Sequence, residues 1–197
     1  TVFEESMAIQ LAFIDLETTG IDPVEGAEIT EIGCILIKDD FSVDSKHTFH
    51  KRFTIQHMDK ANPEALEVGH YNQVIWDKSS VHPEAGLKEW NDWLKEVSPG
   101  GKPIMAAQNA EFDKSFIFAQ CDLYQVFPYI HNTWIDLISL WLAYKLKNKL
   151  THLGDGLGVI CSHFGVDNMN AHAALADAVA SAMCMSKLMK RMNFSNE

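Results

Sequence analysis

Hydrophobic residues in the first quarter of the chain follow the patterns of β-strands. Residues 9–17 (IQLAFIDLE) form a mostly apolar run rich in branched and aromatic side chains, which is typical of a buried strand. The turn sequence TTGIDP follows this run. Residues 28–38 predict a second strand, and residues 47–55 alternate between apolar and polar like a third. Hairpin connections suit these three strands, which indicates an antiparallel section.

From Asn62 onward the apolar residues recur at helical spacing, and helices alternate with short strands. Asn62 followed by Pro63 is a typical helix start. Further strands are expected at residues 103–108 and near 131–136, and further helices at residues 82–97, 111–124, 137–147, 151–165 and 173–192. Three hairpin-linked strands followed by this alternation predict an α/β domain with a mixed five-stranded sheet and helices on both faces.

The length and composition are those of one globular domain. The chain has 197 residues, and we expect a single domain over residues 1–197 with its core at about 9–190. No apolar run approaches the roughly 18 residues that cross a bilayer, so no membrane contact is expected. The N-terminal TVFEES lacks the sections of a secretory signal, which predicts a cytoplasmic protein. The four separated cysteines are then expected to be buried free thiols.

The acidic balance limits how the chain can handle nucleic acid. A net charge of −11 argues against a protein that coats nucleic acid through a broad basic surface. It leaves open an enzyme that handles one phosphodiester in a cleft where cations neutralise the phosphate. The charge therefore predicts a weak grip on the polymer away from such a cleft.

Two carboxylates stand at the end of the first predicted strand. Asp15 and Glu17 are two residues apart, so on a strand their side chains point to the same face. Neighbouring carboxylates repel each other unless a cation lies between them, and ligands that are all oxygen suit Mg²⁺ or Mn²⁺. A pair of this kind is common on its own, but the full string DLETTG after an apolar strand is far more specific.

Two later segments carry further polar residues in predicted helix starts. Asp113 lies just inside the helix that follows residues 103–108. His172 and Asp177 lie in HAALADA, at the start of the last helix. Five residues on a straight helix leave two side chains about 140° apart, so His172 has to precede the regular helix if both are to reach one site. By contrast, Asp136 is interpreted as a helix cap. His47, His50 and His57 fit no zinc signature.

Taken together, these segments resemble the DEDDh exonucleases of the ribonuclease H-like superfamily. The family's D-x-E-T-T-G motif matches residues 15–20. Its H-N-A-x-F-D motif matches residues 109–113 at the motif positions, with Gln108 in place of the usual His. Its H-x-x-x-x-D-A motif matches His172, Asp177 and Ala178. A catalytic Tyr, as in the sister group, would have to stand at Ala173, so the phase of His172 indicates the His subtype.

The resemblance implies a ribonuclease H-like fold and a two-metal 3′→5′ exonuclease that releases nucleoside 5′-monophosphates. It implies that Asp15, Glu17, Asp113 and Asp177 hold two divalent ions, Mg²⁺ or Mn²⁺, with Asp15 bridging them. His172 would take the proton from the attacking water.

Substrate contacts are expected from residues beside these motifs. The candidates for holding the terminal nucleotide are Leu16, Thr18, Asn109 and Phe112, and the candidates for stacking on the last bases are His70 and Tyr71. The expected partner is nucleic acid with a free 3′ end, and single-stranded DNA is favoured. An exoribonuclease is the main alternative, because contacts to the 2′-OH are not encoded in the motifs.

More distant alternatives are a non-catalytic binding module and a subunit docked on a polymerase. The four carboxylates and His172 argue against the first. The lack of a long tail in the sequence favours a stand-alone enzyme over the second. The resemblance is compatible with either a monomer or a homodimer.

Overall fold

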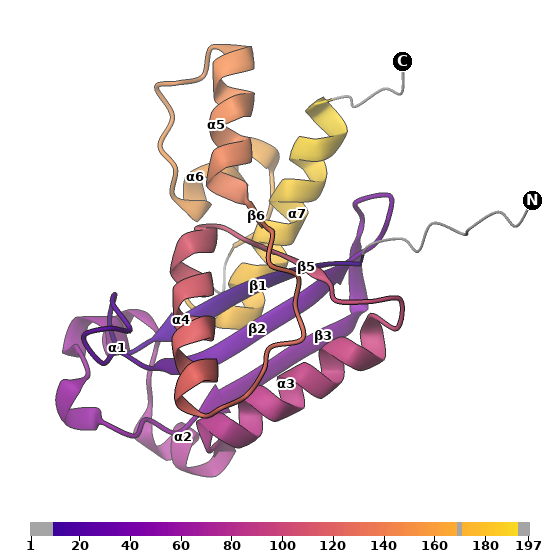
Figure 1. Ribbon diagram of the computed structural model, residues 1–197. Coiled ribbons are helices and arrows are strands. Elements are labelled where there is room, and N and C mark those ends of the chain that lie inside the picture. The colour runs from indigo at the N-terminus through magenta and orange to yellow at the C-terminus, as the bar shows by residue number, and fades with distance from the viewer. Residues whose placement is uncertain (1–9, 169–170, 193–197) are drawn as a thin grey trace, which may run out of the picture.

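A computed structural model describes residues 10–168 and 171–192 and shows one mixed sheet between two layers of helices (Figure 1). The strands are β1 (Leu11–Thr18), β2 (Ile29–Ile37), β3 (Val43–Phe53), β4 (Ser80–Val81), β5 (Ile104–Ala107) and β6 (Trp134–Asp136). The helices are the short 3₁₀ helix η1 (Met58–Lys60), α1 (Pro63–Val68), α2 (Gln73–Ser79), α3 (Pro83–Val97), α4 (Ala110–Leu123), α5 (Leu137–Asn148), α6 (Leu157–Phe164) and α7 (Ala174–Met192). None of these helices is long and apolar enough to cross a membrane.

The sheet has the order β4-β3-β2-β1-β5-β6. β1, β2 and β3 are antiparallel neighbours, whereas β5 lies parallel to β1 and β6 lies parallel to β5. The five expected strands and their antiparallel and parallel directions are therefore confirmed. The two-residue strand β4, which runs parallel to β3, is a sixth strand that the hydrophobic pattern does not reveal.

Each face of the sheet is covered by its own hydrophobic core, as the period-two alternation of the strands requires. Ile14 of β1 packs with Trp90 of α3 and Phe116 of α4 on one face. Phe13 of β1 packs with Trp141 of α5 on the other face, in a core to which α6 and α7 also contribute. β2 lies in the middle and is buried along its whole length. Asp15 and Glu17 share the phase of Phe13, so they point to the α7 face.

The sixth helix begins later than the periodicity predicts, at Leu157 rather than residue 151. The backbone before it is held against α5 by two side chains of that helix. Trp141 Nε1 donates to the Gly154 carbonyl at 3.0 Å, and Lys145 Nζ donates to the Leu153 carbonyl at 3.0 Å. Lys145 also forms an ion pair with Asp155. These bonds use carbonyls that a helix would have kept for itself, so residues 151–156 form a turn.

The N-terminus of α7 rests directly on β2 at Gly33, which is the partner of Asp15 across the β1–β2 pair. A Cβ atom added to Gly33 would overlap the backbone of Ala174 and Leu175. The absence of a side chain at this one position therefore lets the first turn of α7, which carries Asp177, approach the end of β1.

This contact makes Gly33 a sensitive position. We expect Gly33→Ala to destabilise the protein by about 1–3 kcal/mol, because the added methyl group meets backbone atoms that cannot rotate away. Urea denaturation measures this change. Gly158→Ala is the matched control, since nothing lies within 4 Å of its added Cβ and alanine favours the helix there. Equal unfolding midpoints for the two variants would contradict the close contact.

Candidate active site

Three carboxylates from two elements meet at the end of β1. Asp15 and Glu17 come from β1, and Asp177 comes from the first turn of α7. One oxygen of each carboxylate lies within 4.8 Å of the others. Glu17 and Asp177 are buried, and Asp15 is partly buried. The structure thus brings together residues that are 160 positions apart in the sequence.

Asp113 joins this cluster from the opposite side of β1. It lies in the first turn of α4, as expected, and is buried. Its Oδ1 atom and the Oδ1 atom of Asp177 are both buried without a hydrogen-bond partner in the described part of the chain. Buried carboxylate oxygens without partners are costly, so the site is incomplete as a purely protein assembly.

Burial, together with crowding, raises the pKa values of these acids. Desolvation, followed by the charge of Asp113, raises the pKa of Asp15 well above its usual value. Desolvation, with Asp177 and Glu31 adding to it, raises the pKa of Glu17 to about 7. Desolvation is also the main cause that raises the pKa of Asp113 to about 8 and that raises the pKa of Asp177. Such a cluster favours either protons or cations.

The donor set fits divalent metal ions. The ligand atoms offered by Asp15, Glu17 and Asp177 are all carboxylate oxygens, and one oxygen each of Asp113 and Asp177 has no hydrogen-bond partner among the described residues. Hard cations such as Mg²⁺ and Mn²⁺ prefer ligands of this kind. A bound cation would satisfy the orphaned oxygens and remove the mutual repulsion in one step.

His172 lies beside the cluster and outside the regular helix. α7 begins at Ala174, so His172 precedes it, as the angular argument requires. Its backbone is in the left-handed region, with φ 66°, and its N–H donates to Asp177 Oδ2 at 2.8 Å. The exposed imidazole has the ring of His70 as a neighbour, with centroids 6.1 Å apart. Its position beside the carboxylates suits a residue that exchanges protons with solvent.

A cavity of about 500 Å³ opens on one side of Glu17. Three residues expected to hold substrate or metal, Leu16, Glu17 and Thr18, line it together with Phe112. Ile21 and the residues of α1 form much of the remaining wall. The mixture of apolar walls and a few polar groups is typical of a small-ligand pocket.

Two other expected substrate contacts lie elsewhere. Asn109 is exposed at the start of α4 and does not line this cavity. Tyr71 packs on Trp76, with ring centroids 5.0 Å apart, and its hydroxyl donates to Gln73. The roles assigned to both residues in substrate binding stay predictions.

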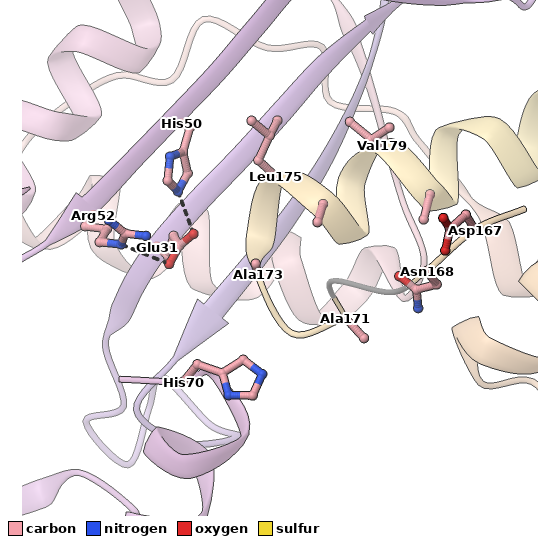
Figure 2. Close-up of a pocket in the computed structure, with 12 residues that line it drawn as sticks. Glu31, His50, Arg52, His70, Asp167, Asn168, Ala171, Ala173, Leu175 and Val179 are labelled. Carbon is pink, nitrogen blue, oxygen red and sulfur yellow. Dashed lines mark hydrogen bonds and ion pairs between the residues drawn. The ribbon is translucent and has the colours of Figure 1, made fainter. Parts of the chain in front are cut away.

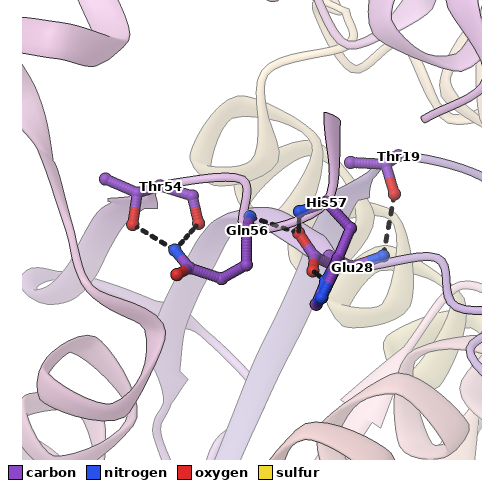
Figure 3. Close-up of polar contacts among 5 residues, drawn as sticks. All are labelled: Thr19, Glu28, Thr54, Gln56 and His57. Atoms are coloured by element: carbon purple, nitrogen blue, oxygen red, sulfur yellow. Dashed lines mark hydrogen bonds and ion pairs between the residues drawn. The ribbon is translucent and has the colours of Figure 1, made fainter. Parts of the chain in front are cut away.

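A buried glutamate that the sequence analysis missed supports the loop beside this cavity (Figure 3). Glu28 Oε2 accepts hydrogen bonds from the backbone of Gln56 at 2.7 Å and of His57, and its Oε1 contacts His57 Nδ1. The Glu28 backbone N–H donates to Thr19 Oγ1, and the Thr19 N–H donates back to the Glu28 carbonyl. The Thr19 carbonyl then accepts from Asn62, the N-cap of α1.

Glu31 is a second buried glutamate of β2, and it lies opposite Glu17 across the strand pair. The signal for both residues was present in EITEIG, because two charged residues inside an apolar strand need buried partners. The partners themselves could not be read from the sequence.

The three histidines near β3 each face a different carboxylate: His47 faces Asp44, His50 faces Glu31 and His57 faces Glu28. Asp136 caps α5, as expected.

Comparison with known proteins gives a consistent picture. The RNase_T family model, described as "Exonuclease", matches residues 12–185. The PolC-type DNA polymerase III of Oceanobacillus iheyensis is 26% identical over 188 residues, which are 90% of this chain but only 11% of the polymerase. The chain thus spans about a ninth of the length of this relative.

Solved structures share the fold at low sequence identity. The nuclease domain of 3′hExo, a DEDDh family member bound to rAMP, superposes with a TM-score of 0.75 at 20% identity, covering 94% of both chains. E. coli exonuclease I in complex with a dT13 oligonucleotide superposes with a TM-score of 0.77 at 19% identity. That match covers 92% of this chain and 41% of exonuclease I.

The raised pKa values predict a stability that depends on pH and on metal. The metal-free fold retains protons that the unfolded chain releases between about pH 4 and pH 8, so its stability is expected to fall as pH rises through this range. Mg²⁺ or Mn²⁺ should raise the melting temperature by about 5 °C at pH 8, and by less at pH 5, where protons compete.

Thermal unfolding in EDTA and in Mg²⁺ or Mn²⁺ at the two pH values measures both effects. Asp15→Asn should weaken both the pH dependence of the melting temperature and its rise with metal. Asp122→Asn changes an exposed carboxylate on α4 and should leave both effects as in the wild type. A melting temperature in EDTA that rises from pH 5 to pH 8 would contradict the assigned repulsion.

Glu28→Ala should lower the free energy of unfolding by about 1–3 kcal/mol, because it leaves the Gln56 N–H without its acceptor. Urea denaturation measures the loss. Glu25→Ala, which removes an exposed carboxylate of the same loop region, serves as the control and should change stability little. A Glu28→Ala variant as stable as this control would show that Glu28 does not support the loop.

Proposed function

We propose, on the premise that the chain belongs to the RNase_T exonuclease family, that it removes nucleoside 5′-monophosphates from the 3′ end of single-stranded DNA with two divalent metal ions. The observation that carries the proposal is the convergence of Asp15, Glu17 and Asp177 on one point, with Asp113 buried beside them. These four acids fall at the positions that the DEDDh motif assigns to metal ligands.

The four carboxylates would hold Mg²⁺ or Mn²⁺ in this proposal, with Asp15 placed to share both ions. Bound ions would supply Lewis-acid stabilisation of the attacking and leaving oxygens in the displacement at phosphorus. The protein's own share is to keep the acids close despite their repulsion. The approach of α7 to β2 at Gly33 and the burial of α4 against β1 support this role.

His172 is the proposed general base. A neutral imidazole nitrogen accepts the proton of the attacking water and passes it to solvent, which its exposed position allows. The bond from its backbone N–H to Asp177 fixes the loop at the edge of the acidic cluster. His172 is therefore a proton-transfer residue in this proposal and not a metal ligand.

The terminal nucleotide is assigned to the cavity beside Glu17. Its volume of about 500 Å³ suits one nucleotide, and its Thr18 hydroxyl and the apolar Leu16 and Phe112 offer contacts to a sugar and a base. Thr18 Oγ1 donates to the Gly20 carbonyl at 2.6 Å, so its oxygen remains able to accept from a sugar hydroxyl. In this proposal the cavity holds the nucleotide at the free 3′ end of the strand.

DNA is the proposed substrate in preference to RNA, and a polymerase-linked role is the second candidate. The fold is shared with a nuclease bound to dT13 and also with a nuclease bound to rAMP. The similarity to PolC-type polymerases adds weight to DNA, and it also favours a proofreading domain as the alternative setting for the same chemistry. The chain covers only a small part of that relative, so a role within a polymerase is proposed separately from the reaction itself.

One assay tests the reaction. A 5′-end-labelled single strand should shorten stepwise from its 3′ end in Mg²⁺ or Mn²⁺, and 5′-mononucleotides should appear as the product. Asp15→Asn should lower kcat by about 10³-fold or more, and His172→Ala by about 10²–10³-fold. Duplex DNA and RNA of the same sequence complete the comparison.

Two exposed residues provide matched controls for this assay. Asp122→Asn and His152→Ala change the same residue types away from the site and should keep wild-type rates. Hydrolysis that persists in EDTA, or that survives Asp15→Asn unchanged, would overturn the two-metal proposal. Cleavage of RNA alone would overturn the preference for DNA.

A further inference from the structure

A second and larger cavity lies on the α7 side of the sheet, with a volume of about 760 Å³ (Figure 2). Its floor is formed by Glu31 of β2 and by His50 and Arg52 of β3. The first turns of α7 form one wall together with Ala171 and Ala173, and His70 lies at one end. Ala171, Ala173 and Ala176 contribute small side chains to this wall, beside the larger Leu175 and Val179.

This cavity lies next to the acidic cluster. Glu31 in its floor is the direct cross-strand partner of Glu17, and Ala173 in its wall follows His172. Gly69, the residue before His70, lies close to Glu17, since a Cβ added there would be 3.0 Å from Glu17 Oε2. The terminal-nucleotide cavity is also lined by Glu17 and by the residues of α1 that precede Gly69. The two cavities therefore flank Glu17.

Three contacts position Arg52 in this floor. Its Nε atom lies 3.5 Å from Glu31 Oε2, its Nη1 atom donates to Ser79 Oγ at 3.3 Å, and its guanidinium carbon is 4.9 Å from the ring centre of Trp76. A guanidinium carries five N–H donors, and in the described part of the chain one of them, on Nη1, forms a hydrogen bond, whereas Nε is ion-paired with Glu31 but has no hydrogen-bond partner. A stacked and ion-paired arginine loses little freedom when its remaining donors bind an anion.

The position of Arg52 is unusual for this protein. The chain carries a net charge of −11 and contains two arginines, of which the other, Arg191, lies at the far end of α7. A nucleic-acid strand approaching an acidic surface is repelled, and fixed cations close to the site oppose this repulsion. One of the two arginines thus lies in the cavity that adjoins the acidic cluster, alongside His50 and His70.

We propose that this cavity binds the phosphodiester backbone of the strand immediately 5′ of the terminal nucleotide, with Arg52 donating to a phosphate oxygen. The inference rests on the proposed function, because it needs the terminal nucleotide in the neighbouring cavity and the scissile phosphate at the carboxylates. Glu31 positions Arg52 for this contact through its Oε2 atom, and its Oε1 atom contacts His50 Nε2. The bound polymer then crosses Glu17 from one cavity to the other.

The test compares a substrate that reaches this cavity with one that does not. A single-stranded DNA 12-mer extends beyond the terminal nucleotide, whereas the p-nitrophenyl ester of thymidine 5′-monophosphate offers one nucleotide only. Arg52→Ala should lower the ratio of kcat/KM for the 12-mer to kcat/KM for the ester by about tenfold, mainly through KM. The slope of log KM for the 12-mer against log salt should fall by about 0.7.

Further variants separate binding from folding. Arg52→Lys keeps a cation and should lower the ratio of the two kcat/KM values less than Arg52→Ala does. Val179→Glu adds a carboxylate to the cavity wall without replacing Arg52 and should also lower the ratio. Arg191→Ala is the matched control, because it removes the other arginine and should leave the ratio within about twofold of the wild type. Thermal unfolding of each variant shows that it is folded at the assay temperature.

A measurement without turnover completes the design. In an Asp15→Asn background, Arg52→Ala should raise the Kd of a 5′-fluorescein-labelled 12-mer by about tenfold, measured by fluorescence anisotropy. A ratio and a Kd that are unaffected by Arg52→Ala, or an equal loss on both substrates, would show that Arg52 serves the structure only. If the wild type hydrolyses neither substrate, the proposed function itself fails, which is distinct from cleavage of both substrates with no effect of Arg52.

Discussion

The burial of four carboxylates close to one another is the constraint on which this architecture depends. Burial raises the pKa values of Asp15, Glu17, Asp113 and Asp177, and neighbouring carboxylates raise those of the first three further, so the assembly costs free energy that other contacts must offset. The two hydrophobic cores on opposite faces of the sheet provide that free energy away from the site. The acids are thus held at the ends of well-packed elements and not on free loops.

The hydrophobic pattern was sufficient for the main layers because each layer has a local signature. The apolar run ending at Glu17, the cap formed by Asn62 and Pro63, and the helical spacing of Leu87 and Trp90 all correspond to elements of the structure. The phase of His172 and Asp177 also depended on local geometry alone, and His172 indeed precedes α7. Features fixed within a few residues of sequence were predictable for this physical reason.

Features fixed by contacts between distant segments were not predictable. α2 and β4 are short and lack clear periodicity, and they are held by pairing with β3 and by the stacking of Arg52 on Trp76. The turn before α6 is set by side chains of α5. The buried charges of Glu28 and Glu31 marked a need for partners, but their partners lie 19 to 29 positions away along the chain. Sequence alone gave no register for those pairings.

The wrapping of residues 149–156 around α5 has a consequence for how such a domain diversifies. No residue of the acidic cluster, and none that lines either cavity beside it, comes from residues 138–166 within the described part of the chain. Within this segment, residues 149–156 are held to α5 by hydrogen bonds from Trp141 and Lys145 to the carbonyls of Gly154 and Leu153. The loop over residues 149–156 can therefore change in length or sequence while the chemistry stays in place, whereas Trp141, Ile160 and Phe164 of the flanking helices belong to the second core. Related domains can therefore differ at this loop while they keep the same acidic cluster.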